Sequence, residues 1–176
     1  MNEIKHLSTP LTEADVRSLH AGDIVSLSGT IFTGRDAAHK RLCALLDENK
    51  PLPVDLAGQL IYFVGPCPAP PGKVIGSAGP TTSGRMDAYS PRLISSCSLR
   101  GMIGKGDRNA DVKAAMKEFG AVYFAATGGA GALIARSIVK AEVVAFEDLG
   151  PEAIYRLEVK DFQLVVAIDS HGETLY

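Results

Sequence analysis

Four glycine-rich segments of the sequence carry residue types that bind small anions. They read GTIFTGRD, GPTTSGR, GKGD and TGGAGA, and each lies near the end of an apolar run. Glycine lets backbone N–H groups approach a ligand closely, and exposed N–H groups in such loops attract anions. Three of the segments also contain a cation, namely Arg35, Arg85 and Lys105. Arginine binds a carboxylate through paired hydrogen bonds, so the pattern predicts a site for a small molecule with more than one anionic group.

Each cation also has an ordinary structural interpretation. Arg35 could simply begin a helix, Arg85 could pair with a surface acid, and Lys105 could be a solvated turn residue, because most surface cations contribute little. Their shared position in glycine-flanked loops favours the binding interpretation for the three together.

Two threonines and one histidine are further candidates for the same site. Thr81 and Thr82 lie in the loop that holds Arg85, so a hydroxyl there could bind a substrate, or transfer a proton if nearby cations lower its pKa. A turn or cap hydroxyl is the structural alternative. His39 lies one helical turn after Arg35 and could face the same pocket, although a solvated or capped helix histidine fits the pattern equally well.

Several other kinds of site are not supported by the sequence. TGGAGA lacks the G-x-G-x-x-G spacing of a dinucleotide site and no suitable acid follows it, so helix packing is the favoured reason for its glycines. No Ser–His–Asp set or Cys–His pair can be assembled. Cys43, Cys67 and Cys97 are odd in number, widely spaced and without a C-x-x-C pattern, which predicts free thiols and no metal or iron–sulfur site built by this chain alone.

The overall composition is that of one ordinary globular domain. The chain has 176 residues, 46% hydrophobic and 22% charged, which is enough to bury a core. A net charge of −2 and 6% aromatic residues argue against nucleic acid as a partner. No apolar run is long enough to span a bilayer and the start lacks a signal-peptide core, so we expect no membrane association and a cytoplasmic protein.

Strand and helix patterns alternate along the first two thirds of the chain. We expect strands near residues 4–7, from Ile24 into the Gly29 and Gly34 region, and near 60–65 and 99–104, because apolar residues alternate or cluster there between turn signals. Helices are expected from Thr12, over 36–49 with Asp36 as N-cap, over 86–97 and over 110–119, where Gly120 supplies the stop. In the second of these helices Ala38, Leu42, Leu45 and Leu46 share one face. The proline-dense stretch 66–72 reads as a long loop within one domain.

The last third continues the alternation. We expect a strand over 121–126, a helix over 129–139 and strands over 142–148 and 162–169. Strands that alternate with helices in this way predict an α/β fold.

The quoted segments together resemble a known enzyme family. GDIVSLSGTIFTGRDAAHKR, GPTTSGRMD, MIGKGD and FGAVYFAATGGAGAL occur in the same order in the β subunit, or C-terminal domain, of class I iron–sulfur fumarate hydratases and of the related L-tartrate dehydratases. The resemblance covers most of the chain. It implies a swivelling β/β/α domain, a single compact layered body over residues 1–176 that moves against a partner domain.

The resemblance also implies roles for individual residues. It makes Thr81 the catalytic base, and Arg35, Arg85 and Lys105 the groups that hold the substrate. The [4Fe–4S] cluster would be bound by cysteines of a partner α subunit and none by this chain, within an α2β2 complex. The implied reaction is reversible hydration of fumarate to (S)-malate. Dehydration of L-tartrate and a non-catalytic anion-binding module of the same fold remain alternatives.

Overall fold

The computed structural model describes residues 3–126 and 134–176. Its elements follow one another as β1 (Ile4–Ser8), α1 (Glu13–Arg17), β2 (Ile24–Thr33), α2 (Asp36–Asp47), β3 (Leu60–Tyr62), the 3₁₀ helix η1 (Ser83–Met86), α3 (Ser90–Cys97), β4 (Gly101–Gly104), α4 (Ala110–Phe119), β5 (Val122–Ala126), β6 (Ile138–Ala145), the 3₁₀ helix η2 (Glu147–Glu152) and β7 (Ile154–Ile168). The expected α/β class is confirmed.

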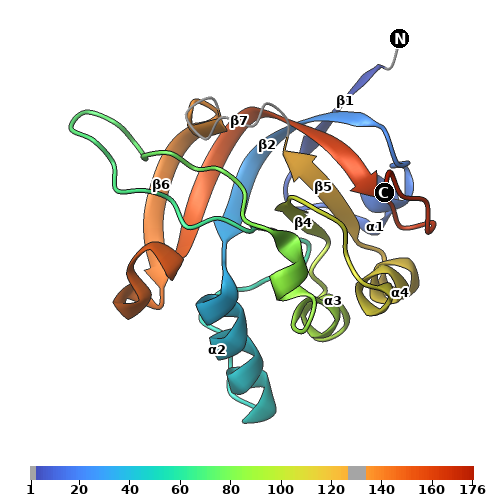
Figure 1. The fold of residues 1–176 in the computed structure, drawn as a ribbon, viewed down its shortest axis with the longest axis horizontal. Helices are drawn as coiled ribbons and strands as arrows, with labels where there is room; N and C mark the ends of the chain where they lie inside the picture. Colours follow the sequence, from blue (N-terminus) through green and yellow to red (C-terminus); the bar gives the residue numbers. More distant parts are fainter. Residues whose placement is uncertain (1–2, 127–133) are drawn as a thin grey trace.

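The described strands form one mixed sheet in the order β1-β2-β3-β4-β5-β7-β6 (Figure 1). Strands β1 to β5 run parallel to their neighbours, whereas β7 is antiparallel to β5, β6 and β2. Because β7 pairs with both β5 and β2, the five strands β2, β3, β4, β5 and β7 close into a ring. Strands β1 and β6 lie outside that ring.

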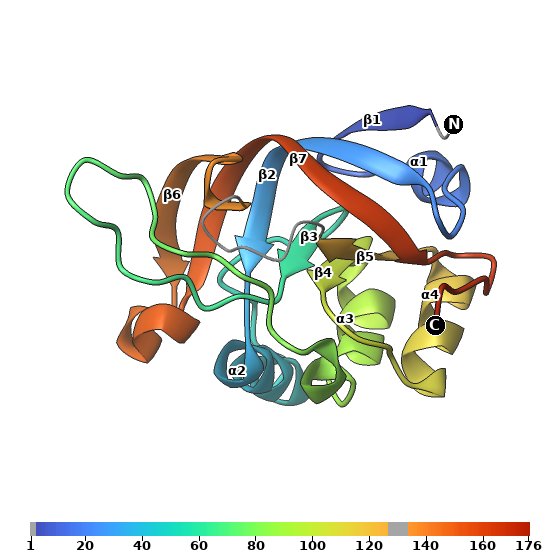
Figure 2. The ribbon, with the colours of Figure 1, turned by 45° about the horizontal axis from the view of Figure 1, so that its top comes forward.

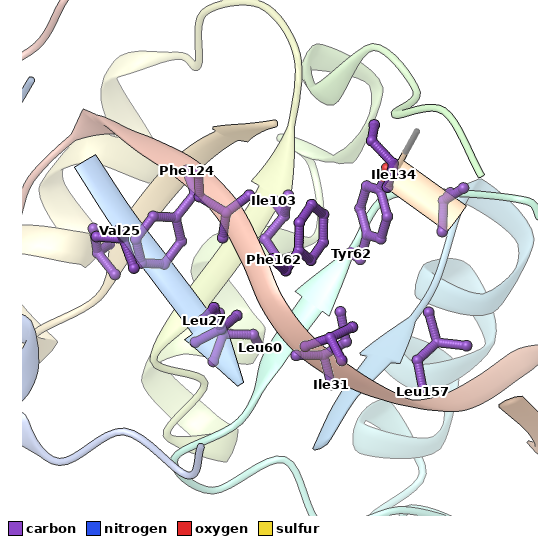
Figure 3. Packing of buried hydrophobic residues seen from close by; sticks show 14 of the residues in the cluster. Val25, Leu27, Ile31, Leu60, Tyr62, Ile103, Phe124, Ile134, Leu157 and Phe162 are labelled. Atoms are coloured by element: carbon purple, nitrogen blue, oxygen red, sulfur yellow. The ribbon is translucent and has the colours of Figure 1, made fainter. Parts of the chain in front are cut away.

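Alternation along the strands divides the apolar residues into two cores. In β3, Leu60 and Tyr62 belong to the first core, while Ile61 belongs to the second. The same period of two separates Phe124 from Tyr123 in β5, as the pleat of a strand requires. Figure 3 shows the first core, in which side chains from β2, β3, β4, β5 and β7 converge.

The second core lies between the sheet and three helices. Helices α2, α3 and α4 cover the same side of the sheet in Figure 2. They contribute Ala38, Leu42, Leu93, Val112 and Met116, all of which are buried. Burial of each large apolar side chain contributes about 1.5–3 kcal/mol to the free energy of folding. The two cores therefore stabilise the sheet from both faces, and the candidate residues lie at one edge of that sheet.

The parallel strands bring the glycine-rich segments to one edge of the sheet. Arg35 follows the carboxyl end of β2, Gly65 follows β3, and Lys105 follows β4. Carboxyl ends of parallel neighbours lie at the same edge, where open α/β sheets usually bind ligands. The fourth segment, TGGAGA, comes after β5 and lies outside the described residues.

The starts of helices α2 and α3 differ from expectation. The N-cap of α2 is Arg35, not Asp36, and its side chain makes no capping hydrogen bond; Asp36 is the first residue of the helix. Leu45 and Leu46 are only partly buried, because the second half of α2 extends beyond the sheet. Helix α3 begins at Ser90, since Pro91 is accepted in the first turn of a helix but not further inside one.

The last third differs more. Of the helix expected over 129–139, residues 134 and 135 are helical, but the helix does not continue to 139, because a turn follows and β6 begins at Ile138; the part before residue 134 lies outside the described residues. Strand β6 ends at Ala145, before the expected residue 148, because Phe146 adopts a left-handed conformation with φ of 56°. Strand β7 begins at Ile154, eight residues before the expected start at 162.

Candidate functional site

The TTSGR segment is joined to the carboxyl ends of β3 and β4. The backbone N–H of Thr81 donates to the carbonyl of Phe63 with N and O 2.7 Å apart, and Thr82 forms a parallel bridge with Lys105. The N–H of Ser83 then donates to the Lys105 carbonyl over 2.9 Å. These contacts hold the threonines beside the lysine, so the structure brings two of the predicted segments into direct contact.

Arg35 follows β2, and its side chain packs against the segment that follows the neighbouring strand β3. The Gly34 N–H donates to the Tyr62 carbonyl over 3.0 Å, which fixes the backbone before Arg35. The arginine side chain lies against Gly65, where a Cβ atom would come within 3.0 Å of Cδ and Nη1. The Nε atom of Arg35 is buried and has no hydrogen-bond partner within the described chain. A buried donor without a partner is costly, so a ligand oxygen that reached this nitrogen would remove that cost.

Arg85 pairs with an acid beside Arg35. Its Nε lies 3.1 Å from Oδ2 of Asp36, and both side chains are nearly half exposed, at 48% and 44%. The structural alternative considered for Arg85, a surface ion pair, is therefore present. Exposed pairs of this kind are worth about 0–1 kcal/mol, so the pair can open at little cost when another carboxylate competes for the arginine.

Lys105 and Thr82 are exposed, and Thr81 is half-buried. The ammonium group of Lys105 has no ion-pair partner among residues 3–126 and 134–176, so it is available to an anion. A long contact of 3.4 Å joins its backbone N–H to the Thr81 carbonyl. The cations predicted from the sequence thus lie at or next to the same strand ends, and Asp36, which follows Arg35 in the chain, is paired with Arg85.

His39 is fully buried in α2, so the solvated alternative is wrong. Its ring packs against Phe63 and Tyr89. Nδ1 lies 2.8 Å from the carbonyl oxygen of Arg35; because a carbonyl can only accept, Nδ1 carries the proton and donates. Nε2 is then an acceptor, and it is buried without a partner in the described part of the structure. His39 therefore holds the backbone of Arg35.

The burial of His39 predicts an acid-sensitive contribution to stability. Desolvation lowers the pKa of His39 to about 4, against an ordinary 6.5, although the Arg35 carbonyl opposes the shift. Below pH 6.5 the unfolded chain takes up a proton that the folded chain refuses. The contribution is thus fully present above pH 6.5 and lost as the pH falls towards 4. We expect about 2 kcal/mol of this loss by pH 5, measured as free energy of unfolding in denaturant titrations.

A matched pair of variants checks this assignment. His39→Asn keeps a donor for the Arg35 carbonyl but does not titrate, so its free energy of unfolding should depend less on pH between 7 and 5 than that of the parent chain. His6→Asn removes an exposed histidine and should leave the dependence unchanged. An identical pH dependence in His39→Asn and the parent chain would contradict the assignment.

Arg108, a buried arginine that the sequence did not single out, connects two loops of the site. The side chain of Arg108 is fully buried, donates to Asp87 Oδ1 over 2.6 Å and to Ser90 Oγ over 2.6 Å, and packs against Phe63 and Tyr123. Asp87 also accepts from the Asn109 N–H, at the start of α4. The pair ties the end of the TTSGRMD segment to the end of the GKGD loop. Within GKGDR this arginine resembles a solvated turn residue, so composition gives no signal for its burial.

The thiols of this chain do not form a ligand set for a cluster. Cys43 and Cys97 are partly buried, on α2 and at the end of α3, and Cys67 is exposed in the long loop; all three are free. Burial raises the pKa of Cys43 and Cys97, which opposes the thiolate form that metals bind.

One group of possible metal ligands lies elsewhere among the described residues. Donor atoms of His20, Asp169 and Glu173 lie within 4.8 Å of one another. Both Asp169 oxygens already accept backbone N–H groups, from Ala21, His171 and Glu173 at 2.8 to 3.0 Å. These bonds join the C-terminal turn to the loop after α1. The Asp169 carboxylate therefore already has a structural role without a metal. No helix in the part of the chain that the structure describes is long and apolar enough to cross a membrane.

Comparison with known proteins decides which family this arrangement represents. The family model described as Fumarase C-terminus matches residues 2–176. The chain belongs to this family. A Methanocaldococcus jannaschii protein that carries the name of an L(+)-tartrate dehydratase subunit beta is 41% identical over 171 residues, which is 94% of this chain and 88% of that protein.

Longer members of the fumarase C-terminus family match as well. The anaerobic class I fumarate hydratase of Escherichia coli is 38% identical and fumarate hydratase 2 of Leishmania major is 34% identical, each over 97% of this chain. The matched region is 32% of either relative. The chain thus spans nearly all of the tartrate dehydratase relative and about a third of the fumarate hydratases. The family resemblance noted in the sequence is confirmed.

Proposed function

We propose that this chain is the β component of an iron–sulfur hydro-lyase that reversibly hydrates fumarate to (S)-malate. The observation that carries the proposal is the junction of the TTSGR segment with the GKGD loop, where the Thr82–Lys105 bridge sets a hydroxyl segment beside a cation. Asp36 holds Arg85 at the same edge, next to Arg35. Family membership supports the choice of reaction.

In this proposal Thr81 moves the proton and the cations hold the carboxylates. In the dehydration direction, the Thr81 oxygen, as its alkoxide, takes the proton from the carbon next to one carboxylate. Negative charge develops on that carboxylate as an aci-carboxylate, which Arg35, Arg85 and Lys105 stabilise. This charge then forms the double bond as hydroxide leaves the neighbouring carbon. Positioned donors of this kind are typically worth about 3–4 kcal/mol each in the transition state. Thr82, the next residue of the segment, carries a second hydroxyl. His39 positions the Arg35 backbone.

The arrangement of Arg85 suits a dicarboxylate that arrives from solvent. The arginine is held near its working place by Asp36, at low net cost, and exchanges this partner for a substrate carboxylate. The buried, unpartnered Nε of Arg35 gains a hydrogen bond when the second carboxylate binds. Binding therefore satisfies a donor that has no partner among residues 3–126 and 134–176 of the free chain.

We assign the [4Fe–4S] cluster to a partner chain, because the three thiols here do not fit one. When bound there, it supplies a Lewis acid for the substrate hydroxyl. The partner is the counterpart of the two thirds of the fumarate hydratases that this chain does not span. We propose an α2β2 complex in the cytoplasm, in which residues 1–176 form a single swivelling β/β/α domain whose site closes against the α subunit.

Dehydration of L-tartrate is the second candidate. It is favoured by the length match with the Methanocaldococcus jannaschii relative, whose name specifies that substrate. Both reactions remove water from a hydroxy diacid and would use the same cations. A non-catalytic anion-binding module is less well supported, because Thr81, Arg35, Arg85 and Lys105 are all present.

The deciding experiment is anaerobic reconstitution with the cluster-binding subunit, followed by assays on fumarate and on L-tartrate. We expect hydration of fumarate by the complex, with at most a trace from either chain alone. Preference for tartrate would select the second candidate. A complex with an intact cluster that acts on neither diacid would contradict the hydro-lyase assignment.

A further inference from the structure

A buried tyrosine links the two loops of the site. Tyr123 lies in β5 and is fully buried, and its hydroxyl lies 2.7 Å from Ser83 Oγ and 2.7 Å from the carbonyl oxygen of Gly106. A carbonyl can only accept, so the phenol proton points to Gly106. The Ser83 hydroxyl must then donate to the phenol oxygen. The result is a directional series of hydrogen bonds, Ser83 to Tyr123 to Gly106, and the side chain of Tyr176 also lies close to the phenol.

The two ends of this series adjoin the residues proposed to act on the substrate. Ser83 lies midway between Thr81 and Arg85, and Gly106 follows Lys105 directly. The backbone bond from Ser83 N–H to the Lys105 carbonyl runs alongside. Gly106 has a φ of 88°, a left-handed conformation that glycine adopts readily, and its carbonyl accepts from the ring hydroxyl.

The contacts around this series of hydrogen bonds leave it little room to shift. Ser83 Oγ packs so closely on Gly104 that a Cβ atom there would come within 1.9 Å of it. The tyrosine ring is held by the Arg108 guanidinium, whose central carbon lies 5.0 Å from the ring centroid and which is itself anchored on Asp87. Burial raises the pKa of Tyr123, so the phenol stays protonated and keeps donating.

We propose that Tyr123 and Ser83 are positioning residues that fix the register between the Thr81–Arg85 segment and Lys105. This rests on the proposed hydro-lyase function. Without the shared phenol, the register between the Thr81 hydroxyl and the Lys105 ammonium depends on backbone bonds alone, although neither group is removed. Small displacements of a reacting group cost rate steeply, because the bound geometry must match the transition state.

The test compares Tyr123→Phe and Ser83→Ala with Ser26→Ala in the reconstituted complex. Ser26 is another buried serine, and it donates to Asp161 over 3.3 Å. We expect Tyr123→Phe and Ser83→Ala to lower kcat roughly tenfold, with KM changed less than threefold. Malate deuterated at the carbon that loses its proton should show a larger isotope effect in both variants, because proton transfer becomes slower relative to other steps. Ser26→Ala should match the parent enzyme in rate and isotope effect.

The double variant is informative because both changes break the same series of hydrogen bonds. Tyr123→Phe with Ser83→Ala should be no slower than the slower single variant; two independent tenfold losses that multiply would overturn the proposal. A parent-like kcat and isotope effect in Ser83→Ala would also overturn it, even if Tyr123→Phe failed to fold.

Amide hydrogen exchange separates this inference from the proposed function. Exchange in residues 79–86 and 104–107 should accelerate at least tenfold in Tyr123→Phe and Ser83→Ala, and stay unchanged in Ser26→Ala. If the parent complex acts on neither diacid but this acceleration is found, the hydro-lyase assignment fails and the loop coupling stands. If activity is found and exchange is unchanged, the coupling fails alone.

Discussion

Replacing Thr81 with alanine should lower kcat of the reconstituted complex by about 10²–10⁴-fold, the usual contribution of a positioned acid or base. The Thr81 backbone is fixed by its bond to Phe63 and by the Thr82–Lys105 bridge, and none of these backbone contacts needs the side chain. The fold should therefore persist, and the loss should fall on kcat. Steady-state rates with fumarate and with malate measure it in both directions.

Exchange of the substrate carbon-bound proton with solvent tests the role of Thr81 more directly. This exchange needs the base but not the departure of hydroxide, so it should fall in parallel with kcat in Thr81→Ala. Thr82→Ala is the matched comparison, because it removes the neighbouring and more exposed hydroxyl. Exchange that persists in Thr81→Ala while turnover falls would make Thr81 a binding group, and a larger loss in Thr82→Ala would transfer the role to Thr82.

Local sequence patterns predicted the elements that depend on near neighbours. Helix α4 begins with Asn109 as a side-chain cap and ends at Gly120, whose φ of 80° is one that glycine adopts readily. Thr12 and Asp15 form a reciprocal capping box at α1, as expected from the hydroxyl and the acidic first turn. Such signals lie within a few residues of the structure that they determine.

The length of β7 depends on partners far away in the chain. Its first half alternates buried Ile154, Leu157 and Val159 with charged residues, a composition that solvated stretches share. Strand β6 offsets these charges of β7. Its Glu142 pairs with Arg156, and its Lys140 lies opposite Glu158. Cross-strand pairs of this kind stabilise a sheet but cannot be read from one strand alone.

The loops of the candidate site could be predicted, whereas their connections could not. Glycines beside cations are visible in any sequence, and parallel strands imply that such loops share an edge. The partner of Arg85, by contrast, proved to be Asp36, which had been expected to cap α2. Tyr123 sits in an apolar run and resembles an ordinary core residue, so its bonds to two loops emerge only from the tertiary structure.

Replacing Arg85 with alanine is the second test with a large expected effect. A clamp that stabilises the aci-carboxylate should be worth about 10²–10³ in kcat/KM, and loss of less than tenfold would be too little for that role. Because the Arg85–Asp36 pair is half exposed, its removal should change stability little. Activity and thermal unfolding, measured on the same preparations, separate the two effects.

Arg92→Ala is the matched control for Arg85→Ala. Arg92 also forms an ion pair from a partly exposed position, with Asp47, but it joins α3 to the far end of α2, away from the strand ends. If both variants keep the parent's melting temperature and only Arg85→Ala loses activity, the arginine contributes charge at the reacting carboxylate. Equal activities in the two variants would reduce Arg85 to a surface ion pair, and the proposed site would then have to bind its diacid with Arg35 and Lys105 alone.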